Sequence, residues 1–184
     1  INLVEIDQVK VAWININKTF GGLKRIAIED NLKISHTGKT LVFASKAAGM
    51  YLPQFKTIAS SMKFGEIQFQ SIMAHEAAHY IDNKIGESLG KRYYSDDFES
   101  SAGKLAMELR KNMNSPTESD YVNATKECFA RAMEQYFAIE NFGIDAQLVY
   151  SYKELDVKRT YVTEEHYVNA EKYASIIKPL VQAF

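Results

Sequence analysis

Disulfides, membrane spans and flexible linkers are all missing from this sequence. Its 184 residues include one cysteine, Cys128, so no disulfide can form within the chain, and only three prolines. The nine glycines do not cluster, and we find no repeat or low-complexity run. No stretch of about 18 apolar residues occurs, so we expect no membrane-spanning helix. A lone cysteine suits a reducing compartment without requiring one, which leaves a secreted, injected or cytoplasmic location open.

An excess of charge of either sign is also missing. The chain has 22 basic and 23 acidic residues, for a net charge of −1. This balance gives no electrostatic case for a nucleic-acid partner. With 46% hydrophobic residues, the length suits one domain spanning 1–184, which we expect to be a monomer. Low proline with much Lys, Asn, Ile and Tyr is typical of AT-rich bacterial or phage genomes.

Short strand-like segments dominate residues 1–62. They are rich in β-branched and aromatic residues and are separated by turn signals such as Gly21-Gly22, Asp30-Asn31, Thr37-Gly38 and Gly49. The segments are 9–15, 25–28, 41–45 and 54–58. We therefore predict a small mixed β-sheet in the N-terminal third of the chain.

Helical periodicity takes over from residue 63 to the end. Apolar residues recur at helical spacing over 67–83, and Gly86 follows as a stop signal. Further helices are predicted over 97–113 and 123–141, and a last one begins at Thr163, whose hydroxyl can cap it. A small sheet followed by packed helices predicts an α+β fold.

The motif that carries chemistry is His75-Glu76-Ala77-Ala78-His79 in the first of these helices. Residues four apart lie on one helix face, so His75 and His79 can hold one metal ion between them. Glu76 lies about 100° round the helix, where it can reach a water bound to that metal. Zn²⁺ lowers the pKa of such a water to about 7, and a carboxylate can take its proton.

An accidental pair of histidines in a buried helix is the alternative. The flanking residues Ile72, Met73, Ala74, Ala77 and Ala78 argue against it, because they make an apolar environment. Two histidines and a glutamate are unfavourable there unless they are paired or bound to a metal. The pattern therefore favours a zinc site.

A catalytic zinc needs a third protein ligand, for which the sequence offers several candidates. A third histidine in the usual extended motif is excluded, because Asp82 and Ile85 occupy the positions of its glycine and histidine. Glu99 follows His79 by 20 residues, a spacing like that of thermolysin-type enzymes, but Gly103 stands where that class has an aspartate.

Glu127 is the favoured candidate, because it interrupts an apolar helix face together with Arg131 and Glu134. Three charges at i, i+4 and i+7 on an inner face need partners. A metal for Glu127 and an ion pair between Arg131 and Glu134 would supply them, and an ordinary solvated charged stripe is the alternative. Glu134 is a lesser candidate for the third ligand.

Two segments resemble a known group of zincins. The first, His75 to Asp82 (HEAAHYID), resembles the HExxHxxD signature of the anthrax lethal factor catalytic domain, the clostridial Pro-Pro endopeptidases and the zincin-like domains of polyvalent proteins from phages and conjugative elements. The second, Glu127 to Ala132 (ECFARA), resembles the later E-x-F-A-x-A helix of that group. The resemblance covers about residues 67–137 and implies a zincin-like fold.

The resemblance also implies roles for single residues. It implies His75, His79 and Glu127 as ligands of a catalytic zinc, with Glu76 as the general base. Asp82 resembles a carboxylate that orients a ligand histidine, with a helix-terminal polar residue as the alternative.

An oxyanion-stabilising tyrosine precedes the ligand glutamate in the toxin members. Counting places Asp120 at that position and Tyr121 beside it, so Tyr121 is the candidate for this role.

Together these features predict a zinc-dependent endopeptidase. A narrow-specificity effector or a phage or mobile-element protease is one form that such an enzyme could take. Its peptide or protein substrate would bind as an extended strand along a sheet edge, for which 41–52 is the candidate segment. The alternative is a catalytically silent binding module with a zincin fold.

Overall fold

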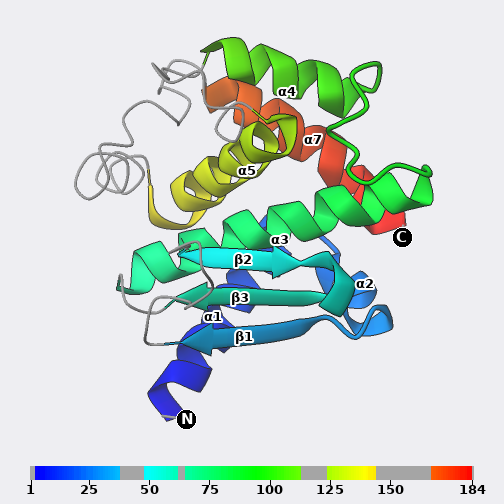
Figure 1. Ribbon diagram of the computed structural model, residues 1–184. Coiled ribbons are helices and arrows are strands. Elements are labelled where there is room, and N and C mark those ends of the chain that lie inside the picture. Colours follow the sequence, from blue (N-terminus) through cyan, green and yellow to red (C-terminus); the bar gives the residue numbers. More distant parts are fainter. Residues whose placement is uncertain (1–2, 38–47, 62–64, 113–123, 144–166, 184) are drawn as a thin grey trace.

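The computed structural model describes residues 3–37, 48–61, 65–112, 124–143 and 167–183 (Figure 1). Over these residues the fold is mixed α+β and mostly helical, with a small three-stranded mixed sheet. The predicted fold class is confirmed at this level. All three strands fall within the N-terminal third, as expected. The predicted strand at 41–45 lies outside the described residues.

The sheet consists of β1 (Lys33–Thr37), β2 (Gly49–Leu52) and β3 (Thr57–Ser61) in the order β1-β3-β2. The strand β3 runs parallel to β1 and antiparallel to β2. Ile34, Ile58 and Tyr51 stand level across it and point to the same face, because side chains alternate along a strand. Ile58 is fully buried there, so this face meets the helices.

The predicted strands at 9–15 and 25–28 are wrong, because both segments are helical. They lie in α1 (Leu3–Phe20) and α2 (Leu23–Glu29). Ala12, Ile16 and Phe20 are fully buried at spacings of four residues, which is a helical stripe rather than an alternation. Burial of this stripe overrides the weak strand preference of its β-branched residues. Gly21 and Gly22, with φ of 71° and 80°, make the predicted turn between the two helices.

The last predicted strand, 54–58, is half correct. The short 3-10 turn η1 (Pro53–Phe55) takes up its first residues, and β3 begins at Thr57. Between them Lys56 has a left-handed backbone with φ of 45°.

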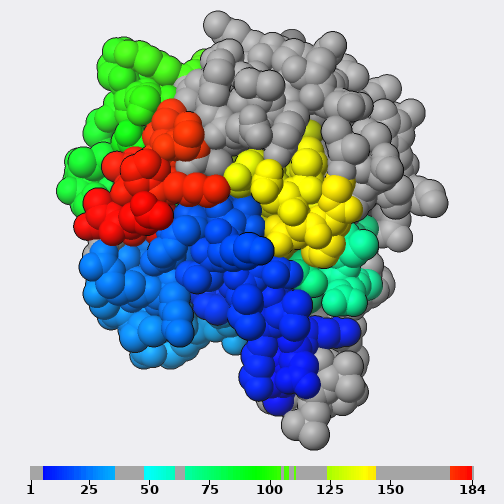
Figure 2. Space-filling model, turned by 180° about the vertical axis from the view of Figure 1, so that it is seen from behind, coloured from blue at the N-terminus to red at the C-terminus, as the bar shows by residue number. Residues whose placement is uncertain are grey.

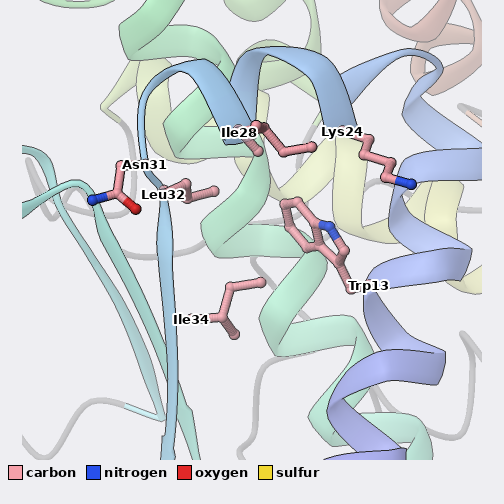
Figure 3. Close-up of a pocket in the computed structure, with 7 residues that line it drawn as sticks. Trp13, Lys24, Ile28, Asn31, Leu32 and Ile34 are labelled. Atoms are coloured by element: carbon pink, nitrogen blue, oxygen red, sulfur yellow. The ribbon is translucent and has the colours of Figure 1, made fainter.

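A hollow of about 330 Å³ lies between α1, α2 and β1 (Figure 3). Leu32 and Ile34, which are only partly buried, line one side of it. Trp13 of α1 forms another side of this hollow. The remaining lining residues are Lys24, Ala27, Ile28 and Asn31.

The motif helix α3 spans Glu66–Ser88, so it runs past Gly86, where the sequence predicted its end. The reason is packing. A Cβ at Gly86 would lie 2.7 Å from the backbone of Tyr93, so only glycine permits this close approach. The glycine marks a contact inside the helix and does not stop it.

Three more helices complete the described fold: α4 (Ser101–Asn112), α5 (Thr125–Phe142) and α7 (Tyr167–Ala183). The helix α4 begins four residues later than predicted, where Ser100 Oγ accepts a hydrogen bond from the Gly103 N–H at 2.9 Å. The helix α5 matches its prediction within two residues and ends at Gly143, with φ of 85°. Residues 163–166, where the last helix was predicted to begin, lie outside the described residues.

The helix α5 is central to the helical layer. It packs against α3, α4 and α7. Figure 2 shows α1, α7 and the far end of α5 next to one another on the back of the molecule, in agreement with contacts among these helices. Among the described helices, none is both long and apolar enough to cross a membrane.

Candidate metal centre

The predicted ligands meet where α3 and α5 pack together. His75 and His79 lie one turn apart on α3, with their ring centroids 4.8 Å apart. Glu127 reaches them from the first turn of α5. Its Oε2 lies 3.5 Å from His75 Nε2, and its Oε1 lies 3.4 Å from His79 Nε2. Two segments about 50 residues apart in sequence thus bring three potential ligands together.

These three residues fit a zinc ion by their geometry. One ligand atom from each lies within 4.8 Å of the others. Ligands about 2.05 Å from a tetrahedral zinc are about 3.4 Å from one another, which matches the two contacts of Glu127. A charge-assisted hydrogen bond would be about 2.7–2.9 Å. Glu127 Oε2 is buried and has no hydrogen-bond partner, so it is suited to a metal.

The cluster lies at the margin of the core. The side chain of Glu127 is 4% exposed, whereas those of His75 and His79 keep 15% and 11% exposure. Nitrogen and carboxylate donors are the set that zinc prefers, and three protein ligands leave a fourth position for water or substrate.

Glu134 holds the other nitrogen of His75. Its Oε2 lies 3.0 Å from His75 Nδ1, one turn beyond Arg131 along α5. A proton held on Nδ1 by Glu134 would leave Nε2 as the nitrogen that gives up its proton to a metal, which is the tautomer a metal requires. Burial by itself lowers the pKa of His75, but Glu127 and Glu134 outweigh burial and raise it to about 10.

Opposite charges likewise dominate the environment of Glu127. Burial by itself would raise its pKa, but His75 and His79 hold this pKa far below its usual range. Arg131, one turn further along α5, lies 3.9 Å from Glu127 Oε2. Glu127 is therefore an anion in the folded protein. The predicted ion pair between Arg131 and Glu134 stays a prediction.

Glu76 is buried on the side of α3 that faces the sheet. The backbone N–H of Tyr51 in β2 donates a hydrogen bond to its carboxylate. A Cβ at Gly49 would lie 3.0 Å from Glu76 and 2.6 Å from Ile72, so β2 approaches the helix closely at this point. Burial raises the pKa of Glu76, and the opposing effect of His75 and His79 does not cancel the rise. A carboxylate with a raised pKa is a stronger proton acceptor.

Asp82 is bound by residues that follow α3. Its Oδ1 accepts a hydrogen bond from the Ser95 N–H at 2.8 Å, and its Oδ2 accepts one from Ser95 Oγ at 2.5 Å. Burial raises the pKa of Asp82 to about 6, and His79 opposes the rise, so the carboxylate and this imidazole influence each other. Its predicted role in orienting a histidine stays a prediction.

Two other sequence candidates have different outcomes. Glu99 does not join the cluster: its side chain is 92% exposed, and it pairs with Lys104 at 3.5 Å. The structure therefore places Glu127, and not Glu99, beside the histidines. Tyr121, the candidate oxyanion donor, lies outside the described residues.

Some contacts of the site escaped sequence analysis. Gly49 was interpreted as a turn signal, yet it opens β2 against Glu76. The Tyr51 contribution comes from a backbone N–H, which has no sequence signature. Ser95 has no motif around it that marks it as a partner of Asp82.

No protein-family model, curated protein or solved structure matches the chain. The centre is therefore interpreted from its own geometry. None of the three cluster residues lines the hollow between α1, α2 and β1.

Proposed function

We propose that this chain is a zinc-dependent endopeptidase whose centre is formed by His75, His79 and Glu127. The observation that carries the proposal is the meeting of these ligands beside Glu76, a buried carboxylate with a raised pKa. A structural zinc site has no need of such a carboxylate. The spacing of the ligand atoms, and a Glu127 Oε2 that is buried without a hydrogen-bond partner, support zinc as the ion.

The protein groups divide the work between holding the ion and moving protons. When bound, zinc supplies a Lewis acid and a water of lowered pKa. Glu76 takes the proton of the attacking water and passes it to the departing amine. Glu134 keeps His75 in the tautomer that leaves Nε2 available, and the Tyr51 N–H keeps the Glu76 carboxylate in place.

A peptide substrate is proposed to lie along β2 in an extended form. This strand is at one edge of the sheet, next to α3, and it touches Glu76 through Gly49. Edge strands bind peptides by backbone pairing, which would bring a scissile bond close to the general base. Only Gly49–Leu52 of the predicted segment 41–52 belongs to the described strand.

The first test is metal content of the purified chain, compared with Glu127→Ala and Glu99→Ala. We expect about one zinc per wild-type chain by elemental analysis. Glu127→Ala should lose it, and Glu99→Ala is the matched control that should retain it, because Glu99 is exposed and outside the cluster. No zinc in wild type after zinc is supplied would refute the metal centre.

The second test separates catalysis from binding. Glu76→Gln should retain zinc and lower cleavage of a mixed peptide library, followed by mass spectrometry, by about 10²–10⁴-fold. Undiminished cleavage by this variant would refute the mechanism. A wild-type chain that binds zinc but cleaves neither the library nor casein would favour a narrow substrate range or the silent binding module.

A further inference from the structure

The loop of residues 91–97 is attached to α3 near the metal centre. Ser95 is fully buried and gives both its N–H and its hydroxyl to Asp82, one turn after His79. Asn83 Nδ2 donates to the Arg92 carbonyl at 2.7 Å. The backbone of Tyr93 lies directly on Gly86. The loop is thus held against α3, the helix that carries both histidines.

The same loop contacts the first turn of α5 at two points. Thr125 Oγ1 donates a hydrogen bond to Asp96 Oδ1 at 2.9 Å. The ammonium of Lys126 lies 5.2 Å from the ring centroid of Tyr93, within cation–π range. Both residues directly precede Glu127. The loop is therefore a bridge between the two helices that supply the proposed ligands.

The first turn of α5 needs such support. Its N-cap residue, Ala124, makes no side-chain hydrogen bond to the N–H groups of the first turn, and only its backbone carbonyl pairs with the Glu127 N–H, at 2.9 Å. Helix ends fray when these groups lack partners. A carboxylate at this end also interacts favourably with the helix dipole, and Asp96 supplies one from outside the helix.

We propose that the 91–97 loop is a positioning device that fixes Glu127 opposite His75 and His79. Its positioning residues are Asp82, Ser95, Asp96 and Thr125, which connect α3 to α5 by hydrogen bonds. The inference rests on the proposed zinc site and adds a set of residues that neither bind the metal nor contact the reacting atoms.

The test uses a matched pair of threonines whose hydroxyl groups make hydrogen bonds at opposite ends of α5. Thr125 is 6% exposed and bonds Asp96 near the metal centre. Thr19 of α1 is 7% exposed and accepts a hydrogen bond from Asn141 Nδ2 at 2.9 Å, in the last turn of α5. The variants are Thr125→Val, Thr125→Ser and Thr19→Val in the full chain. Zinc affinity is measured by competition with a chromogenic chelator, and coordination by the absorption spectrum of the Co²⁺-loaded protein.

We expect Thr125→Val to weaken zinc binding by about 10–100-fold and to change the Co²⁺ spectrum, as loss of outer contacts does in other metal sites. Thr125→Ser keeps the hydroxyl and should restore both. Thr19→Val should retain the wild-type zinc affinity and Co²⁺ spectrum, even if its thermal midpoint falls as much as that of Thr125→Val. This split between affinity and stability distinguishes positioning from general destabilisation.

Two results would overturn the inference: wild-type affinity in Thr125→Val, or equal losses of affinity in Thr125→Val and Thr19→Val. If the wild-type chain binds no zinc, the proposed function fails by itself. A double-mutant cycle in the metal-free protein then decides, because Asp96→Asn and Glu127→Gln should be non-additive in unfolding free energy. The control cycle combines Thr19→Val with Glu127→Gln, whose changes in unfolding free energy should add. If the changes of Asp96→Asn and Glu127→Gln add equally well, the positioning role is overturned.

Discussion

Two stretches of α5 are both buried, but by opposite chemistry. Its N-terminal stretch, up to Glu134, buries Glu127, Arg131 and Glu134, each of which is at most 8% exposed. Its second half buries Phe137 completely, in ring contact with Phe20 of α1 at 6.4 Å. The N-terminal stretch, here called the charged end, therefore contains charges that need partners. The segment around Phe137, here called the apolar end, contains apolar surface that needs only to be covered.

This difference teaches where stability and chemistry reside in the helix. Burial of an apolar ring contributes favourably on its own, whereas a buried ion pair contributes little net stability because its groups must first lose water. Replacing residues at the apolar end should therefore change stability and leave metal binding near wild type, whereas replacing them at the charged end should change metal binding.

The largest expected effect on stability is that of Phe137→Ala. Removing a fully buried ring leaves a cavity, and such substitutions lower the free energy of unfolding by about 3–5 kcal/mol. Denaturant unfolding measures this, and zinc affinity of the folded fraction should stay within about threefold of wild type. Phe142→Ala is the control, because its ring is only partly buried and should cost less. Equal losses from both would contradict the contrast.

A second effect comes from the pH dependence of the charged end. His75 has a pKa of about 10 in the metal-free folded protein and an ordinary value of 6.5. Because the folded pKa is raised, its stabilising contribution is complete below pH 6.5 and is lost as the pH rises through 10. Each pKa unit corresponds to about 1.4 kcal/mol, so we expect the metal-free protein to lose about 2–4 kcal/mol across this range.

Zinc should reverse the sign of this dependence. The ion competes with the proton for His75, so the stabilisation that zinc adds should increase with pH. Denaturant titrations between pH 7 and 9.5, with zinc and with a chelator, measure both trends. Glu127→Gln should flatten the metal-free profile, since it removes one of the three carboxylates (Glu127, Glu134 and Glu76) that raise this pKa. A wild-type metal-free profile as flat as that of the variant would contradict the assignment.

The same contrast explains what could be predicted from the sequence. The charged end of α5 was predictable, because Glu127, Arg131 and Glu134 interrupt an apolar face and so indicate paired or metal-bound side chains. That His75 and His79 lie side by side on one helix face was predictable from their spacing. The apolar stripe of α1 was missed, because 9–15 was interpreted by strand preference and the helical spacing from Ala12 through Ile16 to Phe20 extends beyond that segment.

Glycines show the limit of prediction from the sequence most clearly. Gly86 and Gly49 were interpreted as a stop and a turn, the local functions of glycine. In the structure each instead permits a close tertiary approach, of Tyr93 to α3 and of β2 to Glu76. Such contacts join residues distant in sequence and leave no local pattern. The contacts of the 91–97 loop with Asp82 and Thr125 were unpredictable for the same reason.

The smallest expected change in stability is at Gly49, on the side of the site opposite α5. Gly49→Ala places a Cβ 2.6 Å from Ile72 Cγ2 and 3.0 Å from Glu76 Oε1, so β2 or the carboxylate must shift. Such overpacking costs about 1–3 kcal/mol. We expect zinc affinity to stay near wild type, because α5 is untouched, while cleavage falls through displacement of Glu76. Met50→Ala, one residue on and on the other face of the strand, is the control that should retain activity. Loss of both zinc and activity in Gly49→Ala would contradict this expectation. It would show that the position of Glu76 and the binding of zinc by the ligands depend on each other.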